Sequence, residues 1–510
     1  MRSRGSTALP ATQAEGRTVR RRPPAILLIA AALILVSPGV SNALQAGPHA
    51  VGFETFVAID RSRSFPGAVV ARPRPVVIAT WYPAAAKSGS AMRLADYLAA
   101  EGAALASAGL NDSPTQRSDE FFSDASGRGA DRPELDRLLL LPAAARRGAA
   151  WKKAAFPVLL WAHTDTLAKA LPCEYLASHG FVVISTSPVG TFERDLDVGL
   201  SGAETQARDL EFALAEITAR GHADVSRTAI LGMSFGGISG ICYALRHPDL
   251  RALVSLDGGA GSASGAATIQ QSAYFEAGRL TAPLLHLYQP NGADLAFFEG
   301  LRYCRRALIR FPDLRHPDFS GSGLLEEWAP HYFGPPGEDR RASRADVWNT
   351  TLLFLQSSFS GSCAASSFTT ERTPTAAARR FLDPLPRPLL LEELRGTVEK
   401  GGMAAVEESY RQRLARDPAP ISEDTCRKLG SWLLETRSRE DARRLFSIQL
   451  AMYPRSARAN YALGMTELGI GDKPAATRHL SRSLELLAED ESLDPPTRAR
   501  IDRAAREALQ

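Results

Sequence analysis

Residues 228–237 read Thr-Ala-Ile-Leu-Gly-Met-Ser-Phe-Gly-Gly, and this stretch decides the fold that the sequence predicts. Its first part, Thr228–Met233, is almost wholly apolar, as expected of a strand buried on both faces. A G-x-S-x-G pattern centred on Ser234 follows, and the next glycine opens a predicted helix over Gly236–Ala244. Such a sharp turn lifts the serine hydroxyl clear of the sheet, and the helix directs its N-terminal NH groups toward developing negative charge. A tight glycine turn without chemistry is the alternative.

Similar apolar runs recur on both sides of this stretch. The runs predicted as strands are Val76–Tyr82, Pro157–Ala162, Phe181–Ser185, Leu253–Leu256 and Pro283–Tyr288. Longer amphipathic stretches lie between them, and helices are predicted over Ala168–Ser178 and Ala203–Ala219. Strands that alternate with helices indicate an α/β domain, with a mostly parallel sheet and helices on both of its faces.

A serine hydroxyl becomes a nucleophile beside a base, and that base needs a carboxylate to orient it. With a serine on this kind of turn, the chain order is serine, acid, histidine. His316 is the predicted base, because it lies in a loop after the apolar run Ala307–Phe311. The other histidines after the serine are expected elsewhere: His247 at a helix end, His286 in the core, His479 in the C-terminal region and His331, the second choice, in an aromatic loop.

Two aspartates stand where the acid is allowed. Asp257 directly follows the predicted strand Leu253–Leu256, whereas Asp294 follows Pro283–Tyr288 after a polar turn. The sequence favours Asp257, because side chains at the carboxyl ends of parallel strands converge on one edge of the sheet. Asp294 remains the alternative, and so does a role of Asp257 as the first residue of a glycine turn.

Six short segments stand in a fixed order between about residues 50 and 360. They are Thr80-Trp81-Tyr82-Pro83, Phe156-Pro157-Val158 leading to His163, Leu176-Ala177-Ser178-His179-Gly180-Phe181, Ser234-Phe235-Gly236-Gly237, Leu256-Asp257, and His316 with Asp318-Phe319. This set resembles the platelet-activating-factor acetylhydrolase family of esterases, within the wider dienelactone-hydrolase-like group. The resemblance implies an α/β-hydrolase fold and hydrolysis of esters with short or modified acyl groups, lipid-like esters included. It also implies that no metal or other cofactor is required, and that Ser234 is the nucleophile, His316 the base and Asp257 the acid.

The chain departs from that family at the expected oxyanion site. The family usually has His-Gly where this chain has His163-Thr164-Asp165. The backbone NH groups of Asp165 and Phe235 are the expected oxyanion donors. A carboxylate beside a developing oxyanion opposes catalysis unless it points away, for example if Thr164 or Asp165 caps the helix that starts near Ala168. Two alternatives stay open: a weakened hydrolase that acts as a scaffold, and a serine peptidase or amidase.

The chain ends carry separate signals. The first 43 residues hold six of the arginines and one glutamate, so the rest of the chain has a net charge of −1 and no electrostatic footprint for nucleic acid. The apolar run Ala25–Val36 is too short for a membrane-spanning helix and fits a signal peptide over residues 1–46, with an uncleaved anchor as the alternative. The protein is therefore expected to be exported, either periplasmic or secreted.

Five cysteines without C-x-x-C spacing show no zinc or redox motif, and Cys173 and Cys242 are expected to be packing residues.

The remaining sequence divides into a catalytic domain over 47–360, with an inserted cap or flap at 88–150, a linker over 361–390 and helical repeats over 391–510. Leu429-Gly430 recurs 34 residues later as Leu463-Gly464, and Ala442 and Phe446 recur at the same spacing as Ala476 and Leu480. The period and these positions resemble the tetratricopeptide repeat, which usually binds a protein partner. A generic helical bundle is the alternative.

Overall fold

The computed structural model describes residues 44–66, 71–86, 88–162, 165–221, 223–291, 293–333, 338–361, 373–490 and 493–510. The N-terminal apolar run that suggested a signal peptide lies outside these ranges, as do His163, Thr164 and Cys363. None of the helices within the ranges has both the length and the apolar character needed to cross a membrane.

In the described part of the chain, eleven strands form one sheet in the order β11-β10-β9-β8-β7-β5-β6-β2-β1-β4-β3. Their bounds are β1 Ala50–Pro66, β2 Ala71–Ala84, β3 Ser90–Arg93, β4 Pro142–Arg147, β5 Phe156–Ala162, β6 Val182–Thr186, β7 Ala223–Met233, β8 Ala252–Leu256, β9 Leu284–Tyr288, β10 Arg306–Arg310 and β11 Ala378–Leu382. The six central strands, from β6 to β10, pair in parallel. The predicted α/β class with a mostly parallel sheet is confirmed. Each apolar run predicted as a strand lies within an observed strand, except that the runs beginning at Phe181 and Pro283 start one residue before β6 and β9.

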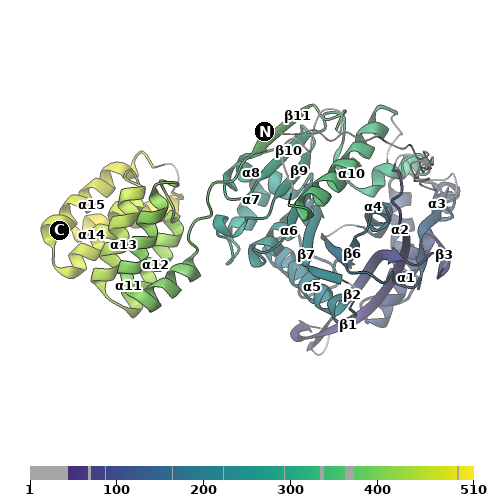
Figure 1. Cartoon of the computed structure of the whole chain (residues 1–510), viewed down its shortest axis with the longest axis horizontal. Helices are drawn as coiled ribbons and strands as arrows, with labels where there is room; N and C mark the ends of the chain where they lie inside the picture. Colours follow the sequence, from purple (N-terminus) through teal and green to yellow (C-terminus); the bar gives the residue numbers. More distant parts are fainter. Residues whose placement is uncertain are drawn as a thin grey trace, which may run out of the picture. The chain divides into compact units, whose positions relative to one another are not determined.

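Helices cover both faces of the sheet (Figure 1). Their bounds are α1 Leu94–Ser107, α2 Gln116–Gly127, α3 Arg132–Leu139, α4 Thr166–Ser178, α5 Leu200–Ala219, α6 Phe235–Arg246, α7 Ala263–Gln270, α8 Ala296–Gly300, α9 Pro330–Phe333 and α10 Glu338–Phe359. In β5, Leu159 and Trp161 belong to a core shared with α1, α4 and α10, whereas Val158 and Leu160 belong to a core shared with α5 and α6. Because successive side chains of a strand point to opposite faces of the sheet, the apolar side chains of β5 alternate between two buried layers.

The segment predicted as an inserted cap or flap, 88–150, is integrated into the sheet at one edge. Its strand β4 pairs in parallel with β1 and antiparallel with β3. Its first helix is attached to α4 by Tyr97, whose hydroxyl donates to the buried carboxylate of Glu174 at 2.5 Å. The backbone NH of Ala145 in β4 donates to the same carboxylate at 3.2 Å. The first helix and strand β4 of the insert therefore both hydrogen-bond to the buried side chain of Glu174.

The sheet continues beyond residue 360, into the range predicted as a linker. Strand β11 pairs antiparallel with β10 over its whole length, and Ala376, just before it, is buried in the core. The Ser-, Thr- and Pro-rich composition of 361–390 concealed this strand. A strand at the sheet edge satisfies the backbone groups of β10 that would otherwise lack partners.

The C-terminal region is all helical. Its helices are α11 Leu391–Leu414, α12 Glu423–Thr436, α13 Arg439–Met452, α14 Ala457–Ile470, α15 Lys473–Leu487 and α16 Pro495–Ala508. The pair α14 and α15 begins 34 residues after the pair α12 and α13. A β-carbon on Gly430 would lie 2.2 Å from the ring of Phe446, and one on Gly464 would lie 2.8 Å from Leu480. The recurring glycines thus stand where the two helices of each pair approach closely.

Candidate active site

Ser234 lies on a strained turn between β7 and α6. Its φ is 55° and its ψ is −126°, a backbone conformation that costs energy for any residue with a side chain. Its carbonyl accepts backbone hydrogen bonds from Gly237 at 2.9 Å and Gly259 at 2.7 Å. Glycine is required at 232, because a β-carbon there would lie 2.0 Å from the carbonyl oxygen of Gly236. Ser234 is only partly buried.

His316 and Asp257 form a close pair. Nδ1 of His316 lies 2.6 Å from Oδ2 of Asp257. The side chain of Asp257 is 12% exposed, whereas that of His316 is 43% exposed. His316 is the first residue of a 3₁₀ turn, His316–Phe319. A proton on Nδ1 donated to the carboxylate leaves Nε2 as the basic nitrogen, which is the tautomer that a general base needs.

Gln289, which the sequence analysis did not select, holds the carboxylate from the other side. Its backbone NH donates to Oδ1 of Asp257 at 3.2 Å, and its side-chain amide donates to Oδ2 at 3.1 Å. It is the first residue after β9, the strand next to β8, which Asp257 follows. That position, at the carboxyl end of the neighbouring strand, is the signal by which it could have been found.

The three predicted triad residues follow strands of the parallel part of the sheet at the same edge. Ser234 follows β7, Asp257 follows β8 and His316 comes six residues after β10. Among the described residues, no hydrogen bond joins Oγ of Ser234 to Nε2 of His316. Such bonds are often long in the absence of substrate and tighten in the reacting complex.

A serine at positive φ between a parallel strand and a helix, followed along the chain by an aspartate and a histidine in contact, decides the architecture. The chain has an α/β-hydrolase fold. In this fold the rival acid, Asp294, is exposed, and its carboxylate accepts from the backbone NH of Ala296 at 2.9 Å; no hydrogen bond or ion pair joins it to His316 among the described residues.

The other histidines considered as bases contact different groups. His331, the second choice, lies 2.6 Å from Glu134, and the remaining contacts are His247 with Glu211 at 2.9 Å, His286 with Ser255 at 3.0 Å and His479 with Glu467 at 2.7 Å. The expectation that His286 is a core residue is confirmed, because it is 1% exposed and stacks on Tyr288 and Phe298. Burial lowers its pKa to about 4, so it is neutral near pH 7.

The expected oxyanion donors lie at two helix N-termini. Phe235 is the first residue of α6, and Asp165 immediately precedes α4. Asp165 occupies the N-cap position of α4, one of the two alternatives that the sequence left open. Its carboxylate makes no cap hydrogen bond and instead accepts one from Nη2 of Arg117 at 2.8 Å. The helix begins at Thr166, two residues earlier than predicted, and the suggested Thr164 cap lies outside the described residues.

Cys173 and Cys242 are buried, as predicted for packing residues, and both are free thiols. Burial raises the pKa of Cys242 to about 12, which keeps it protonated and unreactive near pH 7. Within the described ranges, no group of three or more histidine, cysteine, aspartate or glutamate side chains is arranged to hold a metal ion.

No family model matches the chain. Over 89 residues, or 16% of the chain, it is 36% identical to cutinase est1 of Thermobifida alba and 35% identical to a cutinase of Thermobifida fusca (strain YX), and these segments cover 27% of each relative. Cutinase 1 of Thermobifida cellulosilytica is 35% identical over the same length, covering 31% of that protein. The chain thus spans less than a third of the length of these curated relatives. A solved structure of a ferulic acid esterase from Streptomyces cinnamoneus aligns with a TM-score of 0.46 and 17% identity, covering 65% of this chain and 96% of that one.

Proposed function

We propose that the protein is a serine esterase that hydrolyses carboxylic esters through an acyl-enzyme. The observation that carries the proposal is Ser234 on its strained turn, with the paired Asp257 and His316 following strands at the same edge of the sheet. The segment similar to three cutinases supports ester chemistry. Esters with short or modified acyl groups, lipid-like esters included, are the proposed substrates. The family resemblance to platelet-activating-factor acetylhydrolases favours this class.

In the proposed reaction, Nε2 of His316 takes the proton from the Ser234 hydroxyl as its oxygen attacks the ester carbonyl. Asp257 stabilises the imidazolium that forms, and the NH groups of Phe235 and Asp165 stabilise the oxyanion. The imidazolium then gives its proton to the departing alcohol, which leaves the acyl group on the serine. A water molecule, activated by the same imidazole, attacks the acyl-enzyme and releases the acid.

A scaffold role without catalysis is the competing interpretation, prompted by the unusual Asp165. The ion pair between Asp165 and Arg117 favours the enzyme, because it offsets the charge that would oppose an oxyanion. Export of the protein by a signal peptide, which the N-terminal arginines and the apolar run Ala25–Val36 suggest, remains a proposal. So does partner binding by the C-terminal helices, whose tetratricopeptide-like packing the recurring close contacts at Gly430 and Gly464 support.

Hydrolysis of p-nitrophenyl esters of increasing acyl length, alongside p-nitroanilides of the same acyl groups, tests the proposal. Turnover is expected with esters, fastest with short acyl groups, and more slowly with anilides. A folded protein that hydrolyses none of the esters would contradict the esterase proposal. Turnover of anilides alone would favour a peptidase or amidase instead.

A further inference from the structure

The residue next to the proposed oxyanion site is held by a side chain from the inserted segment. Arg117, in α2, donates from Nη2 to Oδ1 of Asp165 at 2.8 Å and from Nε to Oε2 of Glu101, in α1, at 3.0 Å. Its guanidinium is 19% exposed. Burial alone would lower the pKa of Arg117, but the Glu101 and Asp165 carboxylates raise it above its ordinary value. Nη1 of Arg117 also donates to Oε2 of Glu120 at 3.3 Å, so the arginine is a fixed positive charge among three carboxylates.

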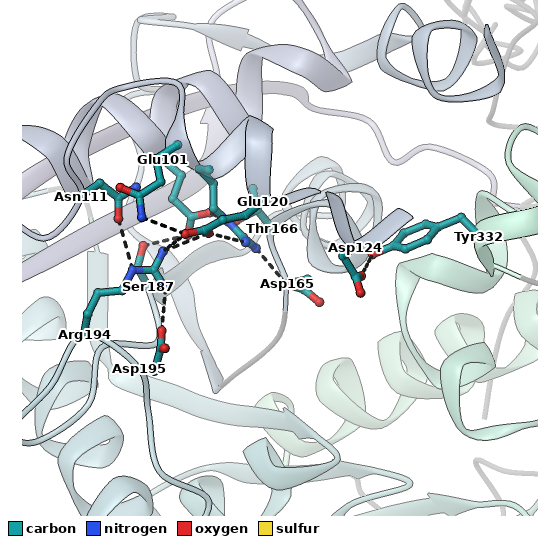
Figure 2. A network of polar contacts seen from close by, with 12 residues as sticks. Glu101, Asn111, Glu120, Asp124, Asp165, Thr166, Ser187, Arg194, Asp195 and Tyr332 are labelled. Atoms are coloured by element: carbon teal, nitrogen blue, oxygen red, sulfur yellow. Dashed lines mark hydrogen bonds and ion pairs between the residues drawn. The ribbon is translucent and has the colours of Figure 1, made fainter. Parts of the chain in front are cut away.

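Glu101 is the buried anchor of this arrangement. Besides Arg117, its carboxylate accepts hydrogen bonds from the Thr166 hydroxyl and, at 2.8 Å, from the Ser187 hydroxyl, and Figure 2 shows these side chains meeting beside Asp165. Burial by itself raises the pKa of Glu101, but Lys169 and Arg117 outweigh it and hold that pKa below its usual value. Glu101 thus stays ionised and fixes the first residue of α4 and the segment after β6 relative to the insert.

The backbone of Asp165 is suited to receive an oxyanion. It is extended, with φ −56° and ψ 149°, and directly precedes the first turn of α4. In the part of the chain that the structure describes, no acceptor takes up its backbone NH. Its carboxylate is 72% exposed, and within the described residues the cation that pairs with it is Arg117.

We infer that Arg117 is a positioning residue for catalysis. It neutralises the Asp165 carboxylate and keeps it turned away, so that the Asp165 NH can serve the oxyanion despite the aspartate at this position. The inserted segment is then part of the catalytic apparatus, although Arg117 itself contacts neither substrate nor reacting atoms. This inference rests on the proposed esterase function.

A purely structural role for Arg117, as an anchor of α2 to Glu101 in α1, predicts a different coupling. The two roles separate in a double-mutant cycle that combines Arg117→Met with Asp165→Asn. If Arg117 offsets a harmful charge, its loss matters only while that charge is present. If Arg117 only anchors α2 through Glu101, its loss is equally harmful with either residue at 165.

The cycle is measured as kcat and KM for a p-nitrophenyl ester, with circular dichroism to confirm folding. Arg117→Met is expected to lower kcat by about 10²-fold, the typical value of one oxyanion donor, with little change in KM. In the Asp165→Asn background the same substitution is expected to lower kcat by less than about threefold, within the usual additivity error. Arg194→Met is the matched control, since Arg194 contacts Glu120 in the same network but not Asp165.

Equal losses in both backgrounds would overturn the inference, as would an Arg117→Met variant with the kcat of the unaltered enzyme. If Arg117→Met does not fold, Arg117→Gln replaces it, because glutamine removes the charge but keeps a donor for buried Glu101. An unaltered protein that hydrolyses no ester would overturn the proposed function, and this inference with it. An active enzyme without the coupling would overturn this inference alone.

Discussion

At the scale of single residues, Ser234 is held at its positive φ by its surroundings. Its carbonyl accepts hydrogen bonds from the backbone of Gly237, in its own helix, and of Gly259, two residues beyond Asp257. A β-carbon on Gly237 would lie 2.7 Å from Cα of Gly258, so the two turns pack without side chains between them. The turns that carry Ser234 and Asp257, the proposed nucleophile and acid, are therefore packed against one another through the backbone.

Asp257→Asn is expected to lower kcat for a p-nitrophenyl ester by about 10⁴-fold. Asparagine retains the shape of the side chain, but it carries no charge to stabilise the imidazolium and does not enforce the required tautomer. Asp294→Asn is the matched control, because this carboxylate contacts the backbone of Ala296 and should leave kcat nearly unchanged. The reverse result, a large loss of kcat in Asp294→Asn and an unchanged kcat in Asp257→Asn, would place the acid in the later loop. Both variants need a folding check.

His286 predicts a pH dependence of stability. Its pKa of about 4 in the folded protein lies below the ordinary value of 6.5, so the unfolded chain binds the extra proton first as the pH falls. Its contribution to the free energy of unfolding is therefore complete above pH 6.5 and is lost between pH 6.5 and about 4. The slope in this window is at most about 1.4 kcal/mol per pH unit.

Denaturant unfolding of the unaltered protein and of His286→Phe, at several pH values from 4 to 7, measures this contribution. Phenylalanine keeps the stacking on Tyr288 and Phe298 but cannot bind a proton. The free energy of unfolding of the variant is expected to fall less steeply on acidification. Parallel curves for the two proteins would show that His286 does not titrate differently on folding.

At the scale of helices and strands, the sequence predicted the buried part of the sheet well and its edges poorly. Strands β5 to β9 are covered on both faces, so their apolar runs are visible without alignment. Strand β4, Pro142–Arg147, lies next to the edge strand β3 and is rich in alanine and arginine, and the other edge strand, β11, has three polar or small residues among five. Pairing with a neighbouring backbone, rather than side-chain pattern, makes these segments strands.

The site was predictable to a similar degree. Ser234, Asp257 and His316 each follow a buried strand, so local signals mark them. Gln289 and Arg117 act through contacts between residues far apart in the sequence, 32 positions for Gln289 with Asp257 and 48 for Arg117 with Asp165. The sequence analysis predicted neither contact: the position of Gln289 directly after β9 is its one local signal, and no periodicity or motif marks the contact of Arg117 with Asp165.

Strand β11 sets the point at which the chain can be shortened. A chain ending at Arg387 keeps β11 and is expected to retain the kcat of the full protein for small esters. A chain ending at Gly361 lacks β11 and buried Ala376, leaves β10 at the sheet edge, and is expected to unfold several degrees lower. Thermal unfolding and ester hydrolysis of both variants make the comparison. Equal melting temperatures would show that β11 adds nothing to stability, and an inert but folded longer variant would give the C-terminal helices a role in the site.

At the scale of the whole molecule, an α/β-hydrolase is joined in one chain to a region of paired helices. The proposed chemistry uses only residues of the hydrolase, and its insert contributes Arg117. The paired helices would then add recognition rather than catalysis. The proposed ester hydrolysis depends on Ser234 as the nucleophile.

The most direct test is to locate the covalent adduct of a fluorophosphonate by peptide mass spectrometry. The account predicts one modified peptide, with the adduct on Ser234. It predicts no adduct on Ser234→Ala, which should give the same circular dichroism spectrum as the unaltered protein. An adduct on another residue, or labelling of Ser234→Ala to the same extent, would contradict the assignment of the nucleophile.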